Sequence, residues 1–276
     1  MAVIRSLKRT PGLLRDQPVL FVPPLLIAIL QTPQLFAQTF DPIVSSLVSI
    51  GMSGLFVFVL PFLFGGAIAI ANDAATSGAT SFGRFLEHGK AFYLSMLGAY
   101  LVFVGISIVF GVVSILIVFV GVFGIVLTNG GASGLIVVGL AYLLIALLFL
   151  AVVALFQFYG HAIVIEGARA FESLKRSVDV VRTNLKQVLG YFAILFVGGM
   201  VMGVAYVAIM LSTFPQPTPG EPAPALDLGP ALVGTAATVV VGTLFGTVFL
   251  VYSVLFYRSV TGLDDSPRSS PTPGRR

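Results

Sequence analysis

The feature that most constrains this chain is a series of long stretches without Asp, Glu, Lys or Arg. A helix needs about 20 apolar residues to cross the hydrocarbon core of a bilayer. Six stretches reach that length, and they cover residues 18–37, 43–71, 91–127, 134–162, 188–213 and 231–257. Hydrophobic residues make up 57% of the chain and charged residues 9%, which excludes an ordinary soluble domain. The sequence therefore predicts an all-α integral membrane protein with six transmembrane helices.

Basic residues are distributed unequally over the connections between these stretches. All 15 Lys and Arg lie in the amino end, in residues 72–90, in residues 163–187 or in the carboxyl tail. The other three connections contain none. Because Lys and Arg near span ends stay on the cytoplasmic side, both termini are expected to be cytoplasmic. We expect a multi-pass protein of the cell membrane, with residues 1–262 as its membrane domain and residues 263–276 as a disordered tail.

The segment 172–187 gathers an unusual share of the charge. Apolar residues recur there at steps of three and four, and charged residues occupy the opposite side: Phe171, Leu174, Val178, Val181, Leu185 and Val188 against Glu172, Lys175, Asp179, Arg182 and Lys186. This pattern predicts an amphipathic helix in the membrane interface that runs directly into the fifth span. The cations expected to bind anionic lipid headgroups are Lys175, Arg176, Arg182 and Lys186. The alternative is a solvated connector whose apolar stripe packs on the bundle.

Similar basic segments precede three pairs of spans. Residues 7–15 read LKRTPGLLR and residues 174–182 read LKRSVDVVR, with Leu, Lys, Arg, a hydroxyl residue and a final Arg at unchanged spacing. A weaker copy, FGRFLEHGK, occupies residues 82–90. The sequence therefore predicts an internal repeat, in which each unit is a basic interfacial segment followed by two spans.

Residues 161–192 also carry a family resemblance. They resemble a segment of prokaryotic polytopic membrane proteins related to the membrane domain of glycerophosphoryl diester phosphodiesterases, and of archaeal membrane families of unknown function. The matching residues are Glu166, Leu174, Lys175, Arg176, Ser177, Arg182 and Asn184. The resemblance implies a membrane domain. In that enzyme family the chemistry resides in a separate soluble barrel, for which this chain has no room, so no enzymatic activity is carried over.

Residues suited to catalysis are scarce. The chain has no cysteine, and its two histidines, His88 and His161, do not occur at metal-ligand spacing. We therefore expect no metal site and no cofactor. One group of polar residues at the cytoplasmic ends of spans could meet across the bundle as a small polar cluster: Asn72, Asp73, His161 and Glu166.

Polar and small residues within the spans have simpler interpretations. We expect the polar ones, among them Gln31, Gln157, Tyr142 and Tyr206, to satisfy one another between helices. The spacing of Gly199 and Gly203, and of Gly234, Thr238, Gly242 and Gly246, predicts close packing between the fifth and sixth spans.

These observations favour a membrane protein without catalytic activity, which binds at the membrane surface or acts as an accessory protein. Its expected partners are membrane lipids or a protein at the cytoplasmic face, and not nucleic acid. The alternative is a permease for a neutral or lipid-like solute. A lipid-modifying enzyme is the third class, and only the polar cluster around Asp73 and Glu166 could supply its catalytic groups.

Overall fold

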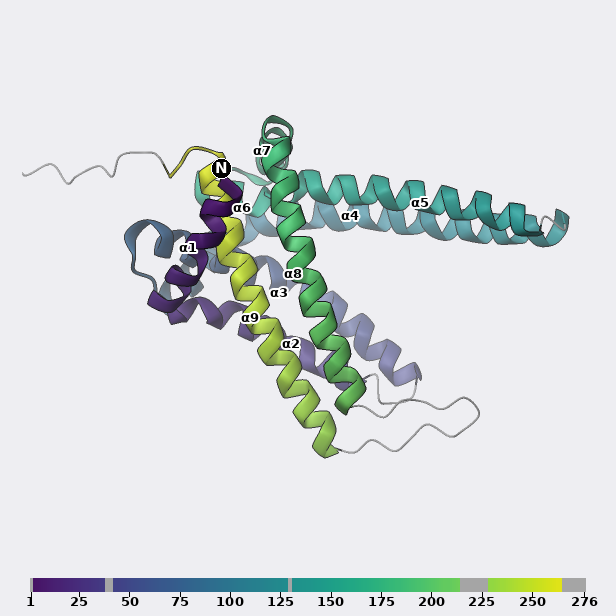
Figure 1. Cartoon of the computed structure of the whole chain (residues 1–276), viewed down its shortest axis with the longest axis horizontal. Coiled ribbons are helices and arrows are strands. Elements are labelled where there is room, and N and C mark those ends of the chain that lie inside the picture. Colours follow the sequence, from purple (N-terminus) through teal and green to yellow (C-terminus); the bar gives the residue numbers. More distant parts are fainter. Residues whose placement is uncertain (1, 38–41, 129–130, 214–227, 265–276) are drawn as a thin grey trace, which may run out of the picture. The chain divides into compact units, whose positions relative to one another are not determined.

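A computed structural model describes residues 2–37, 42–128, 131–213 and 228–264, and every regular element in these ranges is helical (Figure 1). In chain order the elements are α1 (Ala2–Asp16), the 3₁₀ helix η1 (Pro18–Phe21), α2 (Val22–Ala37), α3 (Pro42–Ser77), α4 (Phe82–Thr128), α5 (Gly131–Phe156), α6 (Tyr159–Glu166), α7 (Ala170–Thr183), α8 (Leu185–Thr213) and α9 (Leu228–Val260). The prediction of an all-α protein is confirmed. Residues 265–276, most of the predicted disordered tail, lie outside the described residues.

Several of these helices are long and apolar enough to cross a membrane. Within the described ranges there are five: Ile43–Ser77, Phe82–Leu127, Gly131–Glu166, Leu185–Thr213 and Gly229–Val260. A sixth is reached if the bent pair Ala2–Asp16 and Pro18–Gln34 is one span. Large apolar side chains on α4 and α5 are exposed, which suits contact with lipid and not with water. The protein is therefore a multi-pass membrane protein.

The first predicted span, residues 18–37, consists of η1 and α2 in the structure. α1 meets the next helix at 104°. The 16 residues of α2 rise only about 24 Å, less than the hydrocarbon thickness of about 30 Å. The four residues of η1 add about 8 Å at the rise of a 3₁₀ helix. η1 and α2 together therefore have just the length of a span, with α1 turned away from their axis.

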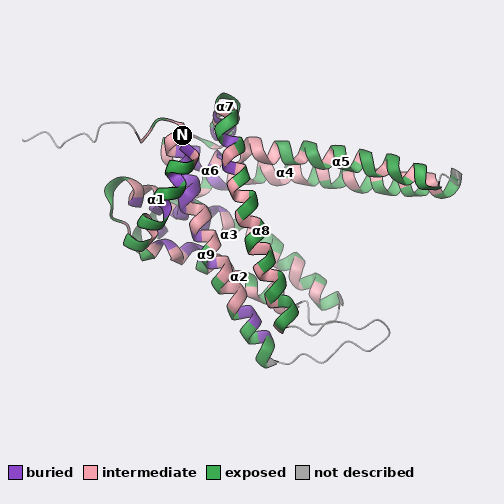
Figure 2. Ribbon diagram, viewed as in Figure 1, coloured by how far each residue is buried: buried purple, intermediate pink, exposed green. Residues whose placement is uncertain are grey.

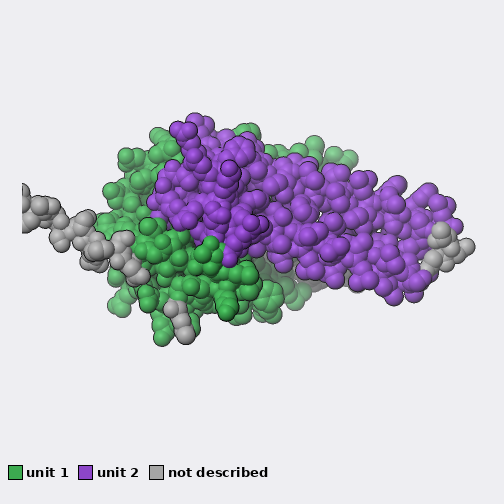
Figure 3. Space-filling model, turned by 90° about the horizontal axis from the view of Figure 1, so that it is seen from above, with its two compact units in different colours: residues 1–92, 183–276 green, residues 93–182 purple. Residues whose placement is uncertain are grey.

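The chain forms two compact units (Figure 3). Unit 1 contains residues 1–92 and 183–276, and unit 2 contains residues 93–182. In unit 1, α9 packs against α1, α2, α3 and α8. The fully buried side chains of unit 1 include Ile70 of α3 and Leu255 and Phe256 of α9. The core of unit 1 thus lies at the carboxyl-terminal ends of α3 and α9.

The amino-terminal helix belongs to the same end of unit 1. α1 buries a row of small residues spaced four apart, Ala2, Ser6 and Thr10. Arg9 Nη1 lies 3.3 Å from Asp264 Oδ2, just beyond the end of α9. The first and last described helices of the chain therefore meet within unit 1.

Unit 2 is a hairpin of α5 and the part of α4 from residue 93 on, extended by two short helices. The two long helices lie side by side (Figure 1), with the rings of Phe110 and Phe149 5.3 Å apart and Gly121 against Val138. Gly167, with φ of 74°, ends α6 in the left-handed conformation that glycine adopts without strain. This turn and a second break at Asn184 separate α7 from the helices before and after it. The helix expected to run directly from residue 172 into the fifth span is therefore interrupted.

Candidate functional site

The helix α7 carries most of the cations expected to bind headgroups. Its first turn is capped by the Glu172 carboxylate, which accepts a hydrogen bond from the Arg169 N–H at 3.1 Å. Its buried face consists of small and aliphatic residues: Ser173, Leu174, Ser177, Val180 and Val181. Phe171, expected on the apolar face, is 71% exposed (Figure 2 shows the burial of each helix). The buried face is thus shifted from the predicted apolar stripe toward Ser173, Ser177 and Val180, and it contains two hydroxyl groups.

Ser177 fixes α7 to the break between α5 and α6. Its hydroxyl accepts a hydrogen bond from the Phe158 N–H at 3.0 Å and donates one to the Leu155 carbonyl at 2.7 Å. An interrupted membrane helix leaves backbone groups without intrahelical partners, and lipid offers no replacement. One buried side chain therefore serves both sides of this break, and it holds α7 there.

The four predicted headgroup ligands fall into two classes. Lys175, Arg182 and Lys186 are exposed and have no hydrogen-bond or ion-pair partner among the described residues. Arg176 instead pairs with Glu166, with Nε 2.8 Å from Oε2 and Nη2 3.1 Å from Oε1. The guanidinium group of Arg176, which we expected to bind a lipid headgroup, thus binds a carboxylate of the protein.

The members of the predicted polar cluster are distributed over the two units. In unit 1, Asn72 accepts a hydrogen bond from Arg258 at 2.8 Å. Asp73 accepts one from Arg84 at 3.0 Å, and its Oδ2 lies 3.3 Å from His88 Nε2. Arg258 also reaches Asp264. Asn72 and Asp73 therefore belong to a network that ties the ends of α3 and α9 to the start of α4.

In unit 2, His161 is 5% exposed and packs edge-on against Phe158, with ring centroids 5.7 Å apart. Glu166 is engaged by Arg176, as described above. Each member of the predicted cluster thus has contacts within its own unit. In the described parts of the chain, no group of three or more His, Asp and Glu side chains is arranged to hold a metal ion.

The three similar basic segments share one ionic contact. Aligning them places Arg9, Arg84 and Arg176 at one position. Each of these arginines pairs with an acidic residue at or just beyond the carboxyl-terminal end of a span: Asp264, Asp73 and Glu166, respectively. A second contact also recurs, because Gly190 lies against Val3 as Gly98 lies against Ala170. The basic segments therefore make the same kinds of contact with the spans in unit 1 and in unit 2.

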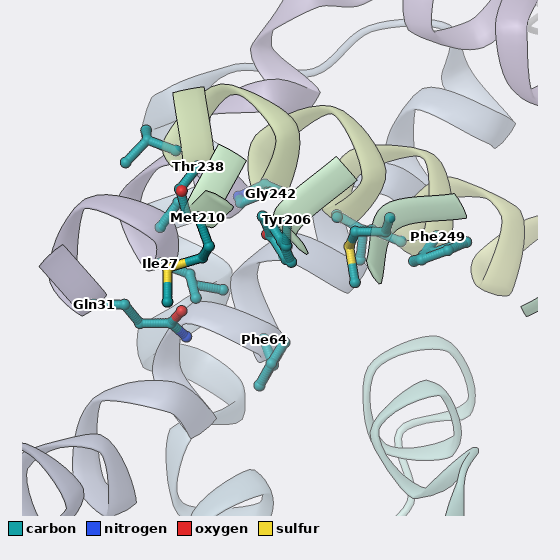
Figure 4. A pocket seen from close by; sticks show the side chains of 15 residues that line it. Ile27, Gln31, Phe64, Tyr206, Met210, Thr238, Gly242 and Phe249 are labelled. Carbon is teal, nitrogen blue, oxygen red and sulfur yellow. The ribbon is translucent and has the colours of Figure 1, made fainter. Parts of the chain in front are cut away.

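A cavity of about 500 Å³ lies within unit 1, among α2, α3, α8 and α9 (Figure 4). Gly242 and Gly246 of α9 form part of its wall, opposite Ala28 and Pro24 of α2. Its lining, as far as the described residues supply it, contains no charged side chain. The volume falls within the range of about 300–1,000 Å³ that is usual for small-molecule sites.

Two expectations about the span interiors are wrong at this cavity. Gln31 and Tyr206 were expected to satisfy other polar groups, but both line the cavity, and neither has a hydrogen-bond partner among the described residues. Gly199 and Gly203 were expected to touch the sixth span, but nothing lies within 4 Å of a Cβ built on either. The close contact of α8 with α9 is at Gly198, against the Phe249 ring. The sequence signal for this cavity was the presence of two polar residues, Gln31 and Tyr206, within predicted spans.

Comparisons with known proteins give one match. No curated protein and no solved structure matches the chain. These comparisons provide no link to glycerophosphoryl diester phosphodiesterases, whereas the expectation of an uncharacterised membrane family agrees with them. A family model matches residues 1–260, nearly the whole chain. The protein therefore belongs to the family described as Domain of unknown function (DUF7847).

Proposed function

We propose that this protein is a non-catalytic membrane protein whose exposed Lys and Arg residues bind anionic lipid headgroups from the cytoplasmic side of the cell membrane. The observation that carries the proposal is the exposure of Lys175 and Arg182 on the side of α7 away from its buried serines. Neither cation has a partner in the described chain. Each Lys or Arg near an anionic leaflet contributes about 1 kcal/mol to lipid attraction.

The amino-terminal helix offers the same arrangement in unit 1. Lys8 and Arg15 correspond to Lys175 and Arg182, and they too are exposed and without partners among the described residues. Ser6 and Thr10 are buried, as are Ser173 and Ser177 at the corresponding positions. This agreement supports an internal repeat, in which each amphipathic interfacial helix presents cations to headgroups and keeps one arginine for an acidic residue of the protein.

The role of Arg176 changes accordingly. Its contact with Glu166 holds the start of the basic segment against the end of a span, so it positions the other cations and is not itself a headgroup ligand. A test of headgroup binding should therefore leave Arg176 in place, because its loss would disturb the helix as well as the charge.

The experiment compares a variant with Lys175→Gln, Arg182→Gln and Lys186→Gln with a control that removes three cations from the tail, Arg268→Gln, Arg275→Gln and Arg276→Gln. Both variants lose the same charge. Phosphatidylglycerol retained by the purified proteins is measured by native mass spectrometry. We expect the first variant to bind this lipid at least about tenfold more weakly, from roughly 1 kcal/mol per cation, and the control to bind as the wild type does. Equal retention in both would refute headgroup binding and favour a cytoplasmic protein partner.

The cavity favours a second candidate function, a permease for a neutral or lipid-like solute. Intramembrane sites of transporters lie at the interface between repeated elements. The cavity is lined by α2 and α3, which follow the first basic segment, and by α8 and α9, which follow the third. Uptake of labelled neutral solutes into proteoliposomes tests this function, and uptake no faster than into protein-free vesicles would exclude it.

A further inference from the structure

The cavity of unit 1 is polar at one end and apolar at the other. Gln31 and Thr238 lie at one end, Phe249 lies at the other, and Gly242 and Tyr206 lie between them (Figure 4). This order follows from the chain, because α2 and α9 run in opposite directions along the wall, with Pro24 beside Gly246 and Ala28 beside Gly242. A molecule that fills the cavity would meet hydrogen-bonding groups at one end and only hydrocarbon at the other.

The polar groups at the first end have hydrogen-bonding capacity to spare. Three other threonines of α9, Thr235, Thr243 and Thr247, donate their hydroxyls to carbonyls four residues back, at 2.8, 2.7 and 2.6 Å. Thr238, which lines the cavity, has no partner among the described residues, and neither have Gln31 and Tyr206. Tyr206 and Thr238 are half-buried and Gln31 is exposed, and unsatisfied polar groups are costly where they face lipid and not water. These three side chains are therefore suited to a ligand that brings its own donors and acceptors.

The charge and size of the cavity limit the ligand further. Among the described residues no charged side chain lines the cavity, so an anionic or cationic headgroup would lack a counterion there, which is unfavourable. Its volume of about 500 Å³ lies within the range usual for small-molecule sites, about 300–1,000 Å³, and suits a small head with one acyl chain.

We infer that this cavity binds a neutral, single-chain amphiphile, with its hydroxyl-bearing head at Gln31, Tyr206 and Thr238 and its chain along Phe249 and Leu250. This site is separate from the cations of α7, and it does not depend on headgroup binding there. Such a site would also serve a permease.

The test uses the delipidated full-length protein and 1-monododecanoylglycerol, whose affinity is measured by native mass spectrometry. Glycerol lacks the chain, and dodecanoate has the chain with a charged head. We expect saturable binding of the monoacylglycerol, and binding of the other two that is at least about tenfold weaker. If all three bind equally, or if the monoacylglycerol does not bind, the inference is wrong and the cavity holds only water.

Matched variants locate the binding. Thr238→Val removes a hydroxyl of the cavity without changing the shape of the side chain, whereas Thr243→Val removes one that bonds within the helix. Ala28→Leu fills the cavity, whereas Ala208→Leu adds the same bulk to an exposed position of α8. We expect about fivefold weaker binding for Thr238→Val, a larger loss for Ala28→Leu, and wild-type binding for both controls. Equal effects within either pair would place the ligand elsewhere.

Two further measurements distinguish binding in the cavity from binding at Lys175, Arg182 and Lys186. If Ala28→Leu does not fold, Thr238→Val and Gln31→Leu still test the head end. The triple variant at Lys175, Arg182 and Lys186 should retain the monoacylglycerol, and Thr238→Val should retain phosphatidylglycerol. A loss of monoacylglycerol binding in the triple variant would mean that the amphiphile binds at these three cations, which would overturn the inference about the cavity.

Discussion

Arg176 donates two hydrogen bonds to Glu166, at 2.8 and 3.1 Å, so its guanidinium fork faces one carboxylate. Such paired contacts fix orientation as well as distance. Because Arg84 and Arg9 pair with Asp73 and Asp264, the acidic residues at the ends of spans select one arginine in each basic segment. The remaining cations of those segments have no hydrogen-bond or ion-pair partner among the described residues.

The pairing predicts a coupling energy between Arg176 and Glu166. The two side chains are 42% and 24% exposed, so solvent screens the pair. We expect a coupling of about 0.5–1 kcal/mol in a double-mutant cycle with Arg176→Gln and Glu166→Gln, measured from unfolding in mixed micelles. Lys175→Gln, which removes an unpaired cation of the same helix, should show no coupling to Glu166→Gln. Equal coupling in both cycles would point to a general field effect and not to this contact.

The sequence predicted the helical class and the membrane location because hydropathy is a sum over many residues. It did not predict where α7 begins and ends, because the breaks before and after this helix depend on single positions, Gly167 and Asn184. It also did not predict the cavity. Gly199 and Gly203 have the spacing of a packing motif, but which face of α8 meets α9 is decided by tertiary contacts such as that of Gly198 with Phe249.

The contacts of Ser177 predict a stability effect that its small size would not suggest. Ser177→Ala removes a buried hydroxyl that bonds to backbone groups on both sides of the break between α5 and α6. We expect a loss of about 1–3 kcal/mol in the free energy of unfolding. Ser107→Ala is the control, because Ser107 donates only to the Phe103 carbonyl of its own helix. If the two variants lose equal stability, Ser177 does not stabilise the break.

A second stability prediction concerns the contact of α3 with α4. A Cβ on Gly66 would lie 2.6 Å from the backbone oxygen of Phe85, which cannot move without shifting the helix. Gly66→Ala should therefore destabilise unit 1 by about 1–3 kcal/mol, as overpacking does. Gly54→Ala in the same helix has nothing within 4 Å and should be neutral or slightly stabilising, since alanine favours helix. Thermal unfolding of the purified variants measures the difference, and a tolerated Gly66→Ala would show that the two helices are not in this contact.

The last prediction concerns orientation, for which the absence of native cysteine is convenient. Ala132 is exposed at the start of α5, in a part of the chain without basic residues, and Lys175 is exposed on α7. Because Lys and Arg are retained in the cytoplasm, Ala132→Cys should face outward and Lys175→Cys inward. An impermeant thiol reagent applied to intact cells should label the first and spare the second, while both should react after the cells are opened.

Ala79→Cys, at an exposed position between α3 and α4, serves as a second inward site. Ser173 would be a poor choice, because its side chain is fully buried and would escape labelling from either side. The contact of Arg9 with Asp264 places α1 beside the end of α9, so a cysteine at exposed Arg5 should behave as Lys175→Cys does. Labelling of Arg5→Cys from outside, with Lys175→Cys protected, would mean that η1 and α2 do not cross the membrane and that only five helices do.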